Sequence, residues 1–259
     1  MSLALANARN LLKKLNISSI ADIDIEDICF REKLFIQTED NLECEGRILF
    51  SDEMAIITIE RNIIDTSHKR FVIAHEMGHF YNERNFTAGK NKFYNCTGEN
   101  FWGIRGVNKN TNEINANLFA AELLMPNELI KNICKGEKFS IKLINKISST
   151  FNVSLTAAAI RLSELDIFPI AIFMTTNAKV SWVSISEGFR YKFIPIGMKV
   201  SSLSYADDYY QNKPIPDEED IPAEAWFKQD YTLRNYNDRI FEIVIPMKRY
   251  NSAMVVLYC

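Results

Sequence analysis

The segment FVIAHEMGHFYNE, residues 71–83, contains the pattern HExxH in a chain that has three histidines in all. The apolar residues around the pattern recur at helical spacing. On a helix, His75 and His79 lie about 40° apart on one face, one turn from each other. Two imidazoles so placed can bind one zinc ion, and Glu76 between them can reach a water on that ion without binding the metal. The pattern therefore indicates metal-assisted hydrolysis.

The chemistry of such a site assigns Glu76 a catalytic role. Zinc lowers the pKa of a bound water from about 15.7 toward 7. Glu76 would accept the proton from this metal-activated water and pass it to the leaving amine. The alternative is coincidence, because average residue frequencies produce HExxH in on the order of one chain of this length in a hundred. Helical context and a third ligand must decide between the two.

A carboxylate is the expected third ligand, since catalytic zinc usually has three protein ligands and an open position. The five cysteines are scattered and form no CxxC pair. Glu113 and Asn117 lie four residues apart on one face of a second predicted helix. We expect Glu113 to bind the metal and Asn117 to hydrogen-bond to a ligand. Glu122 points to the opposite side of that helix and is expected to make a structural contact.

His68 is the third histidine, and it lies on nearly the same helical face as His75. At 1.5 Å per residue it is about 10 Å further along the helix axis, too far to share the ion. A solvated histidine close to the helix cap is the expectation, with a substrate contact as the alternative.

The surrounding pattern predicts an α+β, zincin-like domain over residues 1–168. Helices are expected at 3–15 and 20–30, followed by a small antiparallel sheet, the helix with HExxH, a helix from residue 113 and a helical pair at 139–165. The sheet strands are expected at 33–38, 46–50 and 54–60. Peptidases often bind substrate as an added strand at a sheet edge, and the strand 54–60 is either that edge or an interior strand.

The connection between Glu83 and Asn112 is long, polar and rich in glycine and aromatic residues. Connections of this length are often functional, so it is a candidate lid over the site. Tyr94, Trp102 and Arg105 lie within it and are candidates for contact with substrate or for stabilising an oxyanion. Their spacing does not select one of them.

The character of the chain changes near residue 168, where we place a domain boundary. Residues 169–259 predict a smaller, strand-rich α/β domain with a sensory, substrate-docking or structural role. Its strands are expected at 170–174, 179–185, 191–196, 241–247 and 254–258, and residues 214–224 are expected to form an acidic, proline-rich loop.

The bulk composition is that of a globular protein with a net charge of −3. No apolar run has the length of a membrane span or of a signal peptide, and the scattered cysteines suit a reducing compartment. We therefore expect a cytoplasmic protein without membrane contact. The charge offers no general attraction to nucleic acid, although the pair 139–165 could be read as a helix-turn-helix.

Three blocks of the sequence, in this order, resemble the ImmA/IrrE family of metallo-endopeptidases: RFVIAHEMGHF, EINANLFAAELLMP and FNVSLTAAAIRL. The resemblance extends over residues 1–168. It implies that His75, His79 and Glu113 are zinc ligands and that Glu76 is the catalytic glutamate. It also implies cleavage of a specific protein substrate, a helix-turn-helix transcriptional repressor.

The leading hypothesis is accordingly a zinc-dependent endopeptidase with a repressor as its protein partner. One alternative is a DNA- or protein-binding regulator that keeps the fold without proteolysis. Another is a general peptidase without a dedicated target, which would cut unstructured casein readily. The sequence does not indicate an oligomeric state.

Overall fold

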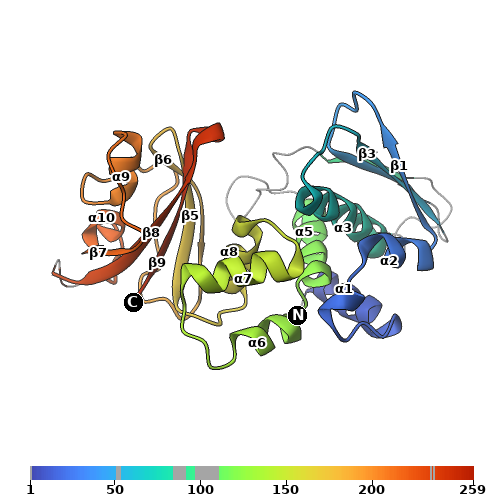
Figure 1. Ribbon diagram of the computed structural model, residues 1–259, viewed down its shortest axis with the longest axis horizontal. Coiled ribbons are helices and arrows are strands. Elements are labelled where there is room, and N and C mark those ends of the chain that lie inside the picture. Colours follow the sequence, from blue (N-terminus) through green and yellow to red (C-terminus); the bar gives the residue numbers. More distant parts are fainter. Residues whose placement is uncertain (1, 51–53, 84–91, 97–110, 234, 236) are drawn as a thin grey trace. The chain divides into compact units, whose positions relative to one another are not determined.

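The computed structural model describes residues 2–50, 54–83, 92–96, 111–233, 235 and 237–259. The chain divides into two compact units, each built on its own β-sheet (Figure 1). The first unit ends at Ala158, and the second comprises Phe139–Ile141 and Ala159–Cys259. The division falls inside a helix, ahead of the expected boundary near residue 168. The predicted α+β class, with a strand-rich C-terminal part, is confirmed.

The first unit contains the elements that surround HExxH. Its helices are α1 (Leu3–Lys14), η1 (Ile20–Asp22), α2 (Ile25–Arg31), α3 (Thr66–Glu83), α5 (Thr111–Leu124), α6 (Asn127–Cys134), α7 (Ile141–Phe151) and the first part of α8 (Leu155–Glu164). Its strands are β1 (Leu34–Glu39), β2 (Gly46–Phe50), β3 (Ala55–Glu60) and β4 (Lys92–Cys96).

The sheet of this unit has the order β1-β3-β2-β4. β3 pairs in parallel with β1 and antiparallel with β2, so the expectation of a wholly antiparallel sheet is wrong in this detail. The loop after β1 passes β3 and is fastened to it, because the N–H of Leu42 donates to the Glu60 carboxylate and the N–H of Glu60 donates to the carbonyl of Glu45. β3 is thus interior, and the edge alternative for the strand 54–60 is wrong. Among the strands that the structure describes, β1 and β4 are the edges of this sheet.

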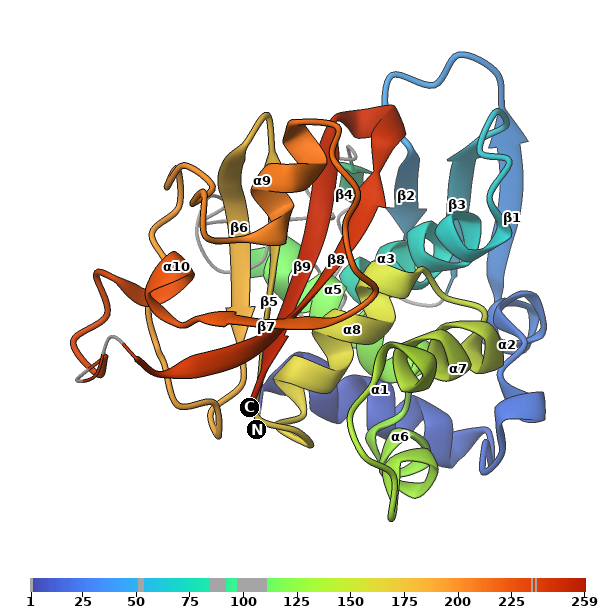
Figure 2. The same ribbon diagram turned by 60° about the vertical axis from the view of Figure 1, so that its left-hand side comes forward.

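Helices α3 and α5 pack together beneath this sheet, and Figure 2 shows α3 next to β2 and β3. Val72, Ile73 and Met77 on α3 are buried, as apolar residues on a core-facing helix should be. The two helix backbones come very close at Gly78, where an added Cβ would lie 2.7 Å from the Cα of Ala116. Gly78 therefore allows α3 and α5 to approach closely enough for their polar side chains to meet.

The second unit is built on a five-stranded antiparallel sheet with the order β6-β5-β9-β8-β7. Its strands are β5 (Ile170–Thr176), β6 (Lys179–Ile185), β7 (Glu219–Pro222), β8 (Arg239–Met247) and β9 (Ser252–Tyr258), and its short helices are α9 (Tyr205–Tyr210), α10 (Glu224–Phe227) and η3 (Lys248–Tyr250). Phe173 packs edge-to-face on Trp226 in its core, with ring centroids 4.5 Å apart.

Two sequence-based expectations for this unit are wrong. Residues 191–196 do not form a strand, because the N–H groups of Lys192 and Phe193 donate to the carboxylate of Asp230 instead of to a neighbouring strand. The strand β7 lies instead within 214–224, the stretch expected to be a loop, where buried Ile221 pairs with Ile240 of β8. Among the described residues, no helix combines the length and apolar character needed to cross a bilayer.

Candidate metal centre

Helix α3 begins at a side-chain cap and ends in the core. The carboxylate of Asp65 accepts from the N–H of His68 at 2.9 Å, which satisfies a donor that the first turn leaves unpaired. Ten residues further along, the helix is enclosed on all sides. His75, Glu76 and His79 are each fully buried. Burying polar and charged side chains is costly unless they are paired, so their partners indicate what the site is built to do.

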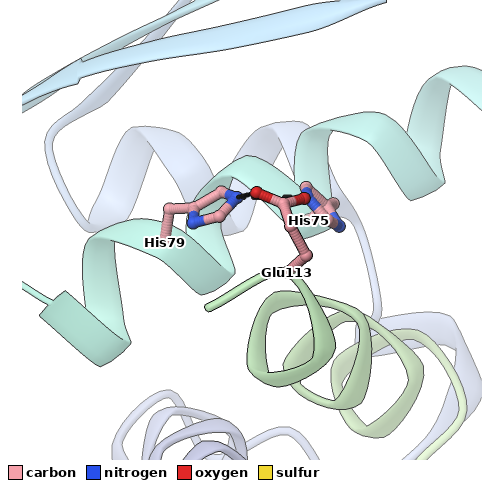
Figure 3. A group of neighbouring side chains, drawn as sticks. All are labelled: His75, His79 and Glu113. Carbon is pink, nitrogen blue, oxygen red and sulfur yellow. Dashed lines mark hydrogen bonds and ion pairs between the residues drawn. The ribbon is translucent and has the colours of Figure 1, made fainter. Parts of the chain in front are cut away.

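The carboxylate of Glu113, from the first turn of α5, points between the two imidazoles (Figure 3). One oxygen lies 3.2 Å from Nε2 of His75 and the other lies 3.4 Å from Nε2 of His79. The two Nε2 atoms are 3.1 Å apart. The donor atoms of the three residues all fall within 4.8 Å of one another, and the side chains are buried. Two nitrogen donors and one oxygen donor that converge in this way can hold a divalent ion.

The outer nitrogen of each imidazole has its own partner, which fixes the ring. Nδ1 of His75 lies 2.8 Å from Oδ1 of Asn117, and Nδ1 of His79 lies 3.0 Å from Oε1 of Glu83. Asn112 donates in turn to the other oxygen of Glu83 at 3.3 Å. Such partners keep the proton on Nδ1 and direct Nε2 toward a metal. The contact of Asn117 was expected from its spacing, whereas Glu83 was missed, although it lies four residues after His79 on the same face.

Strand β2 sits directly against Glu76. A Cβ added to Gly46 would lie 2.9 Å from Oε1 of Glu76 and 2.5 Å from Cγ1 of Val72. The lack of a side chain at Gly46 therefore leaves the room that the Glu76 carboxylate occupies. No signal in the sequence marks Gly46 for this role, because the contact depends on how the sheet lies on α3.

Glu122 and His68 lie outside the cluster. The carboxylate of Glu122 accepts from Nε of Arg9 on α1 at 2.8 Å and is almost fully buried. Nε2 of His68 lies 3.1 Å from the carboxylate of Glu45, and both side chains are partly exposed. These positions agree with a structural contact for Glu122 and with a histidine near the cap for His68. Trp102, Arg105 and the side chain of Tyr94 lie outside the described residues.

Charge in the cluster is strongly coupled. Burial would raise the pKa of Glu113, but the bonds from His75 and His79 lower it to about 2. Burial likewise would lower the pKa of His79, but its bonds to Glu113 and Glu83 raise it to about 9. At neutral pH the metal-free cluster thus contains a Glu113 carboxylate and a protonated His79. A metal ion must displace that proton before it can bind the imidazole.

Metal uptake at pH 7 should consequently release about one proton. Because His79 is protonated below its pKa of about 9, the apparent affinity for zinc should rise roughly tenfold per pH unit up to that value and then level off. Calorimetric titrations in two buffers of different ionisation enthalpy measure the proton count. Identical heats in both buffers would contradict the assignment of a charged His79.

Gly78→Ala should weaken metal binding. The new methyl group meets the Cα of Ala116 at 2.7 Å and its carbonyl oxygen at 2.9 Å, so α3 and α5 must move apart and Glu113 must withdraw from the two histidines. We expect at least about a tenfold loss of zinc affinity, comparable to the loss of an outer contact of a ligand. Competition with a chelator measures it.

Adding Ala116→Gly should not restore the zinc affinity of the Gly78→Ala variant, because the atoms that the new methyl group would contact belong to the backbone of Ala116. Full recovery in the double variant would show that the side chain of Ala116, and not the helix spacing, is responsible.

Fold and site together define a metallopeptidase-type protein, and the comparisons with known proteins name its family. Residues 38–163 match the family described as the IrrE N-terminal-like domain, Peptidase_M78. Metallopeptidase ImmA of Bacillus subtilis (strain 168) is 26% identical over 152 residues, which is 58% of this chain and 81% of that protein. The predicted resemblance to the ImmA/IrrE family, a metallopeptidase family, is thus confirmed over residues 38–163.

A solved structure shows that the fold is shared more widely. It is that of a Mycobacterium tuberculosis transcriptional regulator, and the comparison covers 98% of this chain and 75% of that one with a TM-score of 0.62. The two sequences are 12% identical. At that level the likeness concerns the fold and not the function.

Proposed function

We propose that the protein is a zinc-dependent endopeptidase whose metal is held by His75, His79 and Glu113. The observation that carries the proposal is the buried convergence of two Nε2 atoms and one carboxylate, at 3.2 Å and 3.4 Å, on helices that pack through Gly78. An ordinary core does not concentrate these side chains, because their burial is costly without an ion or a partner.

The donor set fits the proposed metal. Two imidazoles and one carboxylate form a common catalytic zinc set that leaves a position open. Asn117 and Glu83 supply the outer hydrogen bonds that such ligands usually have. When bound, a zinc ion supplies a Lewis acid that polarises a carbonyl and makes water more acidic. The choice of zinc over other first-row ions is part of the proposal, since availability also selects the metal.

Glu76 is proposed to move the proton. Its carboxylate lies next to the metal ligands on α3, and its charge contributes to the raised pKa of His79, so the two groups are close. Gly46 of β2 lies directly against it. In this position Glu76 would accept a proton from the attacking water and donate it to the amine that leaves when the peptide bond breaks.

The substrate proposed for this site is an extended segment of a helix-turn-helix repressor. Kinship with ImmA/IrrE peptidases supports the repressor. The extended conformation is supported by β4, an edge strand whose Cys96 pairs with Gly46, the residue that touches Glu76. A substrate strand added to β4 would therefore run toward the catalytic residues.

The remaining assignments complete this proposal. Residues 1–168 would form the peptidase part, and residues 169–259 would sense a signal or dock the substrate. The protein would act in the cytoplasm, where a repressor is found. Direct binding to nucleic acid is not part of the proposal, because the net charge is −3.

The experiment that tests the proposal is incubation of the purified protein with a repressor encoded beside it, with and without a metal chelator. Cleavage at one site that the chelator blocks and added zinc restores is the expected result. Efficient cutting of casein would favour a general peptidase. Salt-dependent DNA binding with no cleavage would favour a non-proteolytic regulator.

A further inference from the structure

The glycine at position 46 is not required by the backbone. Gly46 is buried and is the first residue of β2. Glycine is disfavoured in strands because it has no side chain to pack and loses much conformational freedom on folding. Among the described residues, the glycines with positive φ are Gly136 and Gly197, so the backbone of Gly46 has a conformation that alanine also adopts. The reason for glycine at this position is therefore space.

The side chains of α3 take up that space. A methyl group at residue 46 would lie 2.9 Å from Oε1 of Glu76 and 2.5 Å from Cγ1 of Val72. The branched side chain of Val72 has little rotamer freedom on a helix. Ordinary van der Waals contact requires Oε1 of Glu76 to withdraw by roughly half an ångström. The position of the Glu76 carboxylate in this structure thus depends on bare backbone at residue 46.

Strand β2 is held in place on both sides at this residue. Gly46 is paired with Ile59 of β3 and with Cys96 of β4. Because β2 is an interior strand, lifting it away from α3 would move its neighbours with it. Oε1, in contrast, is the far end of a flexible side chain. A methyl group at residue 46 would therefore displace the Glu76 carboxylate before it displaced the sheet.

Such a displacement concerns proton transfer and not metal binding. The three atoms nearest to an added Cβ belong to Val72 and Glu76, and none belongs to His75, His79 or Glu113. A group that transfers a proton must lie within hydrogen-bond reach of it, and catalytic groups must be held to within about 0.5 Å of their productive positions. A shift of the Glu76 carboxylate by this amount would reduce turnover while the metal ligands stay in place.

We propose that Gly46 is a positioning residue, which sets the place of the Glu76 carboxylate by presenting bare backbone to α3. The inference rests on the proposed peptidase function, in which Glu76 moves the proton. It assigns β2 an influence on the rate of cleavage that is separate from the metal centre. Gly78, the other close contact of α3, instead sets the distance between the helices that hold the metal ligands.

Gly46→Ala should reduce the turnover number about ten- to hundredfold, as expected for a misplaced catalytic group. KM and the affinity for zinc should remain within about twofold of the wild type, since substrate and metal contacts are unchanged. Arg47→Ala is the matched control on β2, because the next residue of a strand faces the opposite side of the sheet. It should cleave at close to the wild-type rate. Full turnover in Gly46→Ala, or a loss of zinc from it, would overturn the proposal.

Combination with Glu76→Asp shows whether the effect passes through Glu76. Aspartate keeps a carboxylate but is one methylene shorter, so it should relieve the contact with the methyl group at residue 46. Gly46→Ala should then reduce the lower turnover of Glu76→Asp by less than about twofold, although it reduces that of the wild type at least about tenfold. The same factor in both backgrounds would contradict a role through Glu76.

Crystal structures of the wild type and of Gly46→Ala test the same point without activity. Oε1 of Glu76 should move by roughly half an ångström or more, while His75, His79 and Glu113 stay in place. An unmoved carboxylate beneath a lifted β2 would overturn the proposal. So would a Gly46→Ala variant that fails to fold and is not rescued by Glu76→Asp, because the obstruction would then lie at Val72. A wild type without peptidase activity would contradict the proposed function instead, and the position of Oε1 would still decide whether Gly46 places Glu76.

Discussion

Replacing Glu76 with glutamine should abolish peptide-bond cleavage while one equivalent of zinc stays bound. The amide keeps the size of the carboxylate, so the packing against Gly46 is preserved. It cannot accept the proton of the attacking water. Loss of a group that acts as both base and acid should reduce the turnover number by roughly a hundred- to ten-thousandfold. Turnover is measured on the cleaved protein substrate, and zinc by elemental analysis.

Glu122→Gln is the matched control for this variant. Glu122 is also a buried glutamate of the first unit, but its partner is Arg9 and it lies outside the cluster. Its amide variant should cleave at close to the wild-type rate. If Glu76→Gln cut as fast as the wild type, Glu76 would not be the proton acceptor. If both variants lost activity together with zinc, a general loss of structure would be the cause.

Replacing His75 or His79 with alanine should remove zinc and activity together. Each substitution takes away one of the three converging donor atoms and leaves an incomplete site. Loss of an outer partner typically costs 10- to 100-fold in metal affinity, so loss of a direct ligand should exceed about 100-fold. Dialysis against a competing chelator, followed by elemental analysis, should find the variants metal-free.

His68→Ala serves as the control because His68 is the one histidine of the chain that lies outside the HExxH pattern. His68 pairs with Glu45 at a partly exposed position and does not reach the cluster. This variant should retain one equivalent of zinc. Zinc retained by both His75→Ala and His79→Ala would show that the ion binds elsewhere, for instance at cysteines.

The HExxH helix and its distant carboxylate were accessible from the sequence because both depend on helical spacing. Residues four apart share one face of a helix, so His75 lies next to His79 and Glu113 next to Asn117 independently of the tertiary structure. The structure then brings the two helices together, a step that depends on Gly78 and its contact with Ala116. The roles of these residues as metal ligands and catalytic base remain proposals that the variants above test.

The features that the sequence did not predict depend on contacts between distant segments. The parallel pairing of β1 with β3 results from a loop that crosses β3, which strand propensity does not record. Residues 191–196 have the composition of a strand, but Asp230 takes up two of their N–H groups. Gly46 touches Glu76 only because β2 lies on α3. At residues 191–196 a tertiary contact overrode a local preference, and in the other two cases the feature depends on tertiary contacts alone.

Diffraction at the zinc absorption edge, from crystals grown with zinc, tests the central claim most directly. We predict one strong anomalous peak, bound by Nε2 of His75, Nε2 of His79 and the Glu113 carboxylate, with Zn–N distances of about 2.0 Å and a position open to solvent. A peak at other residues, or a Glu113 carboxylate turned away from an ion held by the two histidines alone, would contradict the account.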